Sequence, residues 1–109
     1  MSVATPPRAS SARALSQELT PDGILILTLD VPGATGTEAS GINPRGQIVG
    51  EYTDASGVDH GFVEYRGTFT TIDVPGATDT EASGINPEGQ IVGNYTDAMS
   101  TLHGFAAVP

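Results

Sequence analysis

Apolar residues of this chain occur in short runs that are separated by turn residues, and they do not recur at helical spacing. No run exceeds four residues, as at residues 24–27, and the adjacent pairs Ile48–Val49 and Ile91–Val92 are shorter still. Gly and Pro punctuate these runs throughout, with 14 and eight copies respectively. Short runs bounded by Gly and Pro are typical of β-strands joined by tight turns.

The chain is built around an internal repeat. Shifting the sequence by 43 residues places residues 28–62 over residues 71–105, and only eight of these 35 positions differ. A tandem duplication of this kind predicts that both units adopt one structure. Four short strands per unit fit the pattern. The expected strands are residues 24–31, 37–43, 47–54 and 60–66 in the first unit, and residues 68–74, 80–86, 90–97 and 103–108 in the second.

The links between the expected strands carry recognisable turn sequences. Val-Pro-Gly-Ala at residues 31–34, and again at 74–77, predicts a type II turn because Pro and Gly fill its two central positions. Asn-Pro-Arg-Gly at 43–46 and Asn-Pro-Glu-Gly at 86–89 predict type I turns. A link as short as the Asn43 or Asn86 turn makes the second and third strands of each unit an antiparallel hairpin.

Adjacent apolar residues within a strand indicate that both faces of each sheet are covered. Glycines inside the strands then let neighbouring sheets approach closely. We therefore predict an all-β fold with two four-stranded, propeller-type blades, repeat 1 at residues 23–66 and repeat 2 at residues 67–109. Residues 1–22 contain few large apolar side chains and are expected to form a disordered or weakly ordered N-terminal tail.

Two blades leave one apolar face uncovered on each, so we expect copies of the chain to cover them. Closed rings are the common outcome of such association. Three copies give a six-bladed trimer and four give an eight-bladed tetramer, and both lie in the usual range of about 4 to 8 blades. We prefer the trimer.

Charge and composition exclude several classes of function. The net charge is −9, with 13 acidic residues and four basic ones. This balance argues against nucleic acid and against anionic membranes as partners. The absence of cysteine excludes disulfides and thiolate metal sites. The sequence also contains no secretory signal pattern and no motif that indicates a cofactor or a metal.

Within each unit, the segment Gly-Ile-Asn-Pro, followed by Gly-Gln-Ile-Val-Gly and then His-Gly-Phe, resembles the HAF repeat family. The resemblance covers residues 24–108, with glycine as the middle residue of the final motif at Gly61 and Gly104. It implies a propeller-like β fold and an extracellular location, and it implies no catalytic residues.

Candidate ligand-binding residues occur as equivalent pairs in the two units. Aromatic, carboxylate, amide and imidazole groups at such positions suit weak, repeated contacts with a saccharide between blades. These residues are Tyr52, Tyr95, Glu51, Asn94, Asp54, Asp97, His60 and His103. The alternative interpretation is that they support the fold.

The sequence favours a non-enzymatic repeat protein that assembles into a ring and binds saccharide between its blades. One alternative is a purely structural blade pair, or a fragment of a longer propeller. A polysaccharide-active hydrolase is the remaining hypothesis, since paired carboxylates such as Asp54 and Asp97 are also what that chemistry requires.

Overall fold

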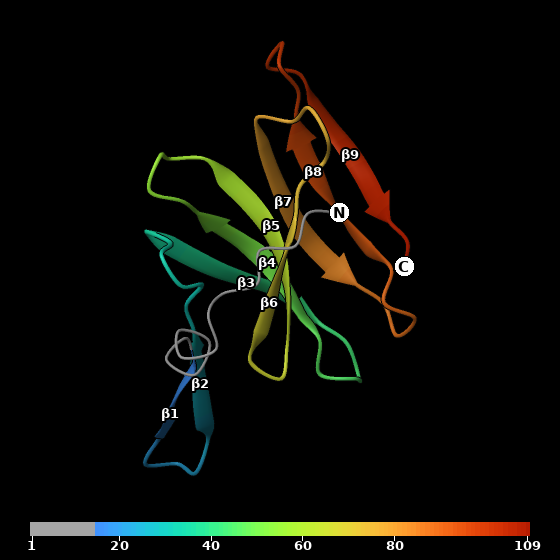
Figure 1. The fold of residues 1–109 in the computed structure, drawn as a ribbon. Helices are drawn as coiled ribbons and strands as arrows, with labels where there is room; N and C mark the ends of the chain where they lie inside the picture. Colours follow the sequence, from blue (N-terminus) through green and yellow to red (C-terminus); the bar gives the residue numbers. More distant parts are fainter. Residues whose placement is uncertain (1–14) are drawn as a thin grey trace.

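The structure is a computed structural model that describes residues 15–109, and these form nine antiparallel strands in three sheets (Figure 1). β1 and β2 make a two-stranded sheet, β3 to β6 a four-stranded sheet in sequential order, and β7 to β9 a three-stranded sheet. The predicted all-β fold is confirmed. The strands are β1 (Leu15–Leu19), β2 (Leu25–Leu29), β3 (Gly36–Ile42), β4 (Ile48–Thr53), β5 (Asp59–Tyr65), β6 (Thr68–Ile72), β7 (Asp79–Ile85), β8 (Ile91–Thr96) and β9 (Leu102–Ala107).

The predicted turns form where their sequences occur. Ala34 N donates a 3.0 Å hydrogen bond to Val31 O, and Gly33 between them has φ +83°, as the second central residue of a type II turn requires. Gly46 N donates to Asn43 O at 3.0 Å to close the β3–β4 hairpin. The Asn43 side chain also donates to the Asn86 carbonyl at 3.0 Å, so it ties the equivalent turns of the two repeats together.

The predicted grouping of strands into two four-stranded blades is wrong by one strand. The segment at residues 68–74 was expected to open repeat 2, but β6 pairs with β5 and completes the first sheet. The reason is the two-residue turn Arg66–Gly67, in which both residues have positive φ. Such a turn matches the twist of a hairpin and leaves β6 no room to reach another sheet. The sheet of repeat 2 therefore has three strands among the described residues.

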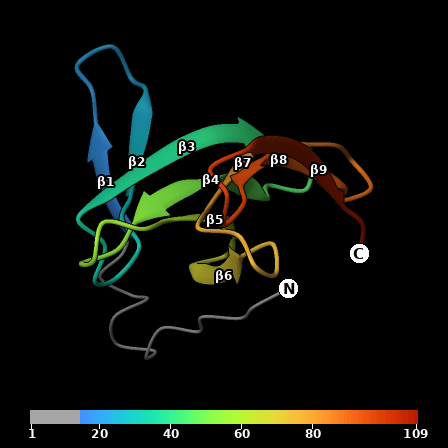
Figure 2. The same ribbon diagram turned by 90° about the horizontal axis from the view of Figure 1, so that it is seen from above.

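The segment at residues 24–31 was expected to open repeat 1, and this prediction is also wrong. Its strand, β2, pairs with β1 in a separate hairpin. β1 lies at residues 15–19, inside the region expected to be a weakly ordered tail, while residues 1–14 of that region fall outside the described part. Figures 1 and 2 show the β1–β2 hairpin at one end of the molecule and β9 at the other.

One core lies between the sheets of the two repeats. It contains Val49 and Ile72 from the first sheet and Ala82 and Ile91 from the second, all at most 6% exposed. Gly61 allows this contact, because a Cβ there would lie only 3.0 Å from the Ile72 carbonyl oxygen and 3.4 Å from the backbone nitrogen of Ala82 in the facing sheet. The expectation that strand glycines let the sheets approach is confirmed.

A second core lies on the outer face of the first sheet. Phe62 and Phe69 are buried there, with ring centroids 5.5 Å apart in an edge-to-face arrangement. Val31, from the link between β2 and β3, completes the buried cluster. The first repeat thus has packed side chains on both faces of its sheet.

Equivalent bulges interrupt β3 and β7. The register shifts between Ala39 and Gly41 in the first repeat, and between Ala82 and Gly84 in the second. At the first bulge the Glu38 carbonyl occupies the space that a side chain at position 50 would need, so only glycine fits there. The described strands alternate with turns throughout, and no helix among residues 15–109 is long and apolar enough to cross a membrane.

Candidate functional site

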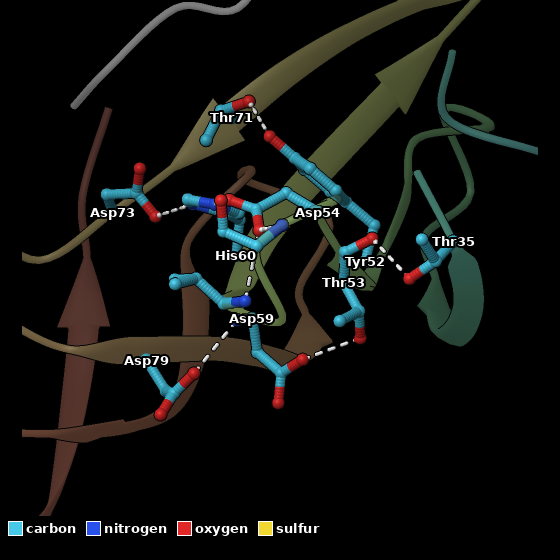
Figure 3. Close-up of polar contacts among 11 residues, drawn as sticks. Thr35, Tyr52, Thr53, Asp54, Asp59, His60, Thr71, Asp73 and Asp79 are labelled. Carbon is cyan, nitrogen blue, oxygen red and sulfur yellow. Dashed lines mark hydrogen bonds and ion pairs between the residues drawn. The ribbon is translucent and has the colours of Figure 1, made fainter. Parts of the chain in front are cut away.

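Two predicted binding residues meet on neighbouring strands of the first sheet. Tyr52 of β4 lies opposite His60 of β5 in the strand register, and their rings stack with centroids 5.0 Å apart (Figure 3). The Tyr52 hydroxyl lies 2.8 Å from the Thr71 hydroxyl of β6, within hydrogen-bond distance. Burial raises the pKa of Tyr52 above its ordinary value. The phenol is therefore neutral, covered on one ring face by His60 and held at its hydroxyl by Thr71.

His60 has a carboxylate at each ring nitrogen. Its Nε2 atom lies 2.8 Å from Asp54 Oδ2, and its Nδ1 atom lies 2.8 Å from Asp73 Oδ1 (Figure 3). Asp54 is fixed in turn, because its Oδ1 atom accepts hydrogen bonds from the backbone N–H groups of Ser56 and Val58. With both ring nitrogens engaged by carboxylates, neither is available to take a proton from a nucleophile.

The two carboxylates favour the charged form of the imidazole ring. Burial lowers the pKa of His60, but the hydrogen bonds and negative charges of Asp54 and Asp73 outweigh burial and raise the pKa above its ordinary value of 6.5. The hydrogen bond from His60 is the main cause that lowers the pKa of Asp54, and the backbone N–H donors add to it. The ring and its partners form a charged, mutually satisfied unit.

The second repeat forms the same arrangement in part. Tyr95 and His103 stack with centroids 4.9 Å apart, and His103 Nε2 lies 2.8 Å from Asp97 Oδ2. Among residues 15–109, no second carboxylate is bonded to His103. Its side chain is 40% exposed, against 20% for His60. The predicted Tyr, Asp and His residues are therefore brought together as two separate groups, one per repeat.

The predicted pair Glu51 and Asn94 occupies equivalent positions with different surroundings. Glu51 lies opposite Glu38 in the strand register, whereas Asn94 lies opposite Glu81 and is exposed. Burial raises the pKa of Glu51 to about 7, with further contributions from its hydrogen bond to Glu38 and from the charges of Glu81, Glu38 and Asp59. Glu51 belongs to a group of acids that is distinct from the His60 site.

This group, the acidic cluster, consists of Glu51, Asp59 and Glu81, each of which has one carboxylate oxygen within 4.8 Å of one oxygen of each of the other two. Oxygen donors of this kind suit a hard cation such as Ca²⁺, but three carboxylates are fewer than the six to eight ligands that Ca²⁺ takes. Asp59 is also engaged, because it accepts a 2.6 Å hydrogen bond from the Thr53 hydroxyl. A proton on Glu51 reduces the repulsion among these three carboxylates, as a bound cation would.

Sequence reasoning missed the acidic cluster and the role of Asp73. The cluster draws one residue each from β4, β5 and β7, which lie in two sheets, so no local spacing signals it. Asp73 reaches His60 because β6 pairs with β5. The turn sequence Arg66–Gly67 is the signal that could have revealed this.

A cavity of about 500 Å³ opens between the two sheets near the end of β9. Its apolar lining includes Val63, Ile91 and Ala107, with Arg45 and Glu88 at the polar side. None of the predicted binding residues lines this cavity.

Comparison of the chain with protein-family models, with curated proteins and with solved structures found no significant match in any of the three. The resemblance to HAF repeats therefore stays a prediction.

Proposed function

We propose that the chain is a non-enzymatic β-repeat module that assembles with copies of itself, head to tail, into a closed ring of propeller-type blades. One observation carries the proposal. Val49 is 0% exposed between the two sheets, whereas Val92, at the same position on the outer face of the second sheet, is 53% exposed. When an apolar position is fully covered in one repeat and exposed at the equivalent position of the other, we infer that another sheet packs on the exposed face in the assembly.

The outer face of the first repeat offers the complementary surface at β3, beside the core of Phe62 and Phe69. Ala82 is 1% exposed in the core between the sheets, while its counterpart Ala39 is exposed. The two outer faces are made of the same residue types that already pack against each other within one chain. A second copy can therefore repeat the internal contact, and repeated head-to-tail contacts close into a ring when the rotation between blades allows it. A six-bladed trimer is the preferred form.

The His60 site supports a structural role for the paired residues. Both ring nitrogens of His60 bind carboxylates, and the Tyr52 ring is covered by His60 on one face. These contacts use the groups that a saccharide or a catalytic reaction would need. Saccharide binding and an extracellular location stay predictions from the sequence, and the geometry favours self-assembly over either saccharide binding or hydrolysis.

The test is the mass of the assembly in solution, measured by light scattering coupled to size exclusion. The chain has a mass of 11.1 kDa, and a trimer is expected at about 33 kDa. Val92→Lys should convert the assembly to monomers, because it places a charge in the covered face. Met99→Lys is the matched control, since Met99 is 86% exposed in a loop. A well-folded monomer of the unaltered chain at high concentration would contradict the proposal.

A further inference from the structure

Within the described part of the chain, the β9 edge of the second sheet is open where the first sheet carries a fourth strand. In repeat 1, β6 pairs with β5 from Gly61 opposite Ile72 to Tyr65 opposite Thr68. β9 is the repeat counterpart of β5. Among the described residues, β9 has β8 as its only strand neighbour. An open edge presents unpaired backbone N–H and C=O groups that another strand can bind.

β2 is the repeat counterpart of β6, because the 43-residue shift places residues 25–29 over residues 68–72. The links that follow the two strands are also equivalent. Val31 N donates to Thr37 Oγ1 at 3.1 Å, and Val74 N donates to Thr80 Oγ1 at 3.3 Å. β6 is the last strand of the first sheet and leads into β7. β2 leads into β3 in the same way, so it holds the place of the last strand of a sheet that would precede β3.

Among residues 15–109, β1 is the only strand that pairs with β2, so β2 keeps its other backbone edge open. Thr20 N donates a 2.8 Å hydrogen bond to Ile24 O at the turn. Hydrogen-bonded pairs alternate along an antiparallel ladder, so alternate residues of β2 direct their backbone groups away from β1. Those residues are Leu25, Leu27 and Leu29.

The same alternation fixes which residues face the open edge of β9. Asp97 N donates to Thr101 O at 2.9 Å where β8 turns into β9. Counting along the ladder, Gly104 and Ala106 direct their backbone groups away from β8. Their counterparts Gly61 and Val63 are the residues that face β6 in repeat 1.

From these matched edges we infer that a second copy of this chain adds its β2 to the open edge of β9, antiparallel and in the register that β6 keeps with β5. Gly104 and Ala106 then pair with the second copy's Leu29 and Leu27. The β1–β2 hairpin stays intact, because β2 uses its free edge. This inference rests on the proposed self-assembly and specifies the strand that makes the contact.

The same register completes the half-formed site at His103. The second copy's Asp30 is the counterpart of Asp73, so it arrives at His103 Nδ1, the nitrogen whose equivalent in His60 binds Asp73 at 2.8 Å. The second copy's Thr28 likewise arrives at the Tyr95 hydroxyl. The His103 site is thus shared between two copies, and its present exposure of 40% falls toward the 20% of His60.

Exposed apolar residues on β2 support this contact. Ile26 and Leu27 are 45% and 49% exposed, although they are large and apolar. Ile26 is the counterpart of Phe69, which is 1% exposed beneath the first sheet. Addition to β9 gives Ile26 the buried position of Phe69.

The decisive experiment is cross-linking between two single-cysteine variants, because the chain has no cysteine of its own. Ile26→Cys and Ala107→Cys form a directly opposed pair that is not hydrogen-bonded, with Cα atoms about 4.5 Å apart, close enough for a disulfide. Mixed under mild oxidation, they should give a disulfide between the two variants at least about 10-fold faster than the control mixture of Ile26→Cys with Ala106→Cys, whose side chains point to opposite faces.

A second readout tests the shared site directly. Asp30→Ala and His103→Ala should each weaken assembly about 5- to 10-fold, and the double variant should be no weaker than either one, as expected of direct partners. Circular dichroism checks that each variant is folded. Additive effects of the two substitutions would overturn the assignment of Asp30 to His103.

The outcomes separate the two proposals. A monomeric chain overturns both. An assembly of the expected mass in which Ile26→Cys and Ala107→Cys fail to cross-link overturns the strand addition alone. Preferential cross-linking of Ala107→Cys to Ala9→Cys assigns the edge to residues 1–14, and this also overturns the inference while self-assembly stands.

Discussion

The two repeats share most of their residues and differ in how well those residues are covered. Phe62 is 0% exposed in repeat 1, and its counterpart Phe105 in repeat 2 is half-buried. His60 binds two carboxylates, and His103 binds one. The comparison teaches that local sequence specifies the strands and turns, whereas the neighbouring sheet or strand decides how far each side chain is buried. Three sets of substitutions test this, in order of expected effect.

The largest difference is expected for the equivalent phenylalanines. Phe62→Ala removes a fully buried ring that packs against Phe69, and it should lower the free energy of unfolding by about 4 kcal/mol. In the monomeric Val92→Lys background, Phe105→Ala should cost about half as much as Phe62→Ala, because the Phe105 ring is partly exposed in the single chain. Chemical denaturation of both variants measures the difference. Equal losses would show that the two repeats are covered alike in solution.

A smaller difference is expected at the histidines, and it depends on pH. The pKa of His60 is raised in the folded chain, so the stabilisation from its charge is complete below about pH 6.5 and is lost as the pH rises through the raised value. His60→Gln should therefore lower the free energy of unfolding by about 1 kcal/mol at pH 5.5, and by less at pH above the raised pKa.

Two carboxylate variants control this result. Asp73→Asn removes one partner of His60 and should flatten part of the pH dependence. Asp22→Asn changes an exposed carboxyl in the β1–β2 turn and should leave it unaltered. Thermal denaturation across the pH range provides the measurement. An unchanged pH profile in His60→Gln would show that the ion pairs do not contribute.

The smallest effect is expected at Glu51, where repeat 2 has Asn94. The pKa of Glu51 is raised to about 7, so its ionisation penalises the folded state increasingly between the ordinary value of 4.5 and about 7. Because the group is partly solvated, Glu51→Asn should raise the free energy of unfolding by only about 0.5–1 kcal/mol at pH 8. The gain should vanish below pH 4.5.

The reciprocal variant sharpens the comparison. Asn94→Glu places a carboxylate directly opposite Glu81 and should lower the free energy of unfolding by about 0.5 kcal/mol at pH 8. Urea denaturation at pH 4 and pH 8 measures both variants. A loss of stability in Glu51→Asn at pH 8 would mean that the acidic cluster is held by a cation rather than by a proton.

Much of the fold could be predicted because its information is local. The duplication, the strand positions and the Val31 and Asn43 turns follow from residues that are close in sequence. Apolar patterning could not predict which strand β2 pairs with or which strand β6 pairs with, because strands of the same pattern can join either neighbouring sheet. The two-residue turn at Arg66–Gly67 decides the matter for β6, and pairing with β1 decides it for β2.

The contacts of the candidate site also fall into those that local sequence predicts and those that depend on distant strands. The contact between Tyr52 and His60 follows from the hairpin of β4 and β5. The repeat shows in the sequence that Tyr95 and His103 hold the equivalent positions. Asp73 joins His60 only through β6. The acidic cluster forms only because the sheets of the two repeats pack together, and that packing depends on contacts far apart along the chain.

The bulge in β7 changes which side chains of the strand point toward the first sheet. Ala82 and Ile85 are three residues apart and would point to opposite faces of an unbroken strand, yet both contact the core between the repeats. The extra residue, Ser83, shifts the alternation of side chains between the two faces by one residue, so Ile85 points to the inner face like Ala82. Ser40 holds the same place in β3, so the duplication copied a shift in phase together with the residues that it orients.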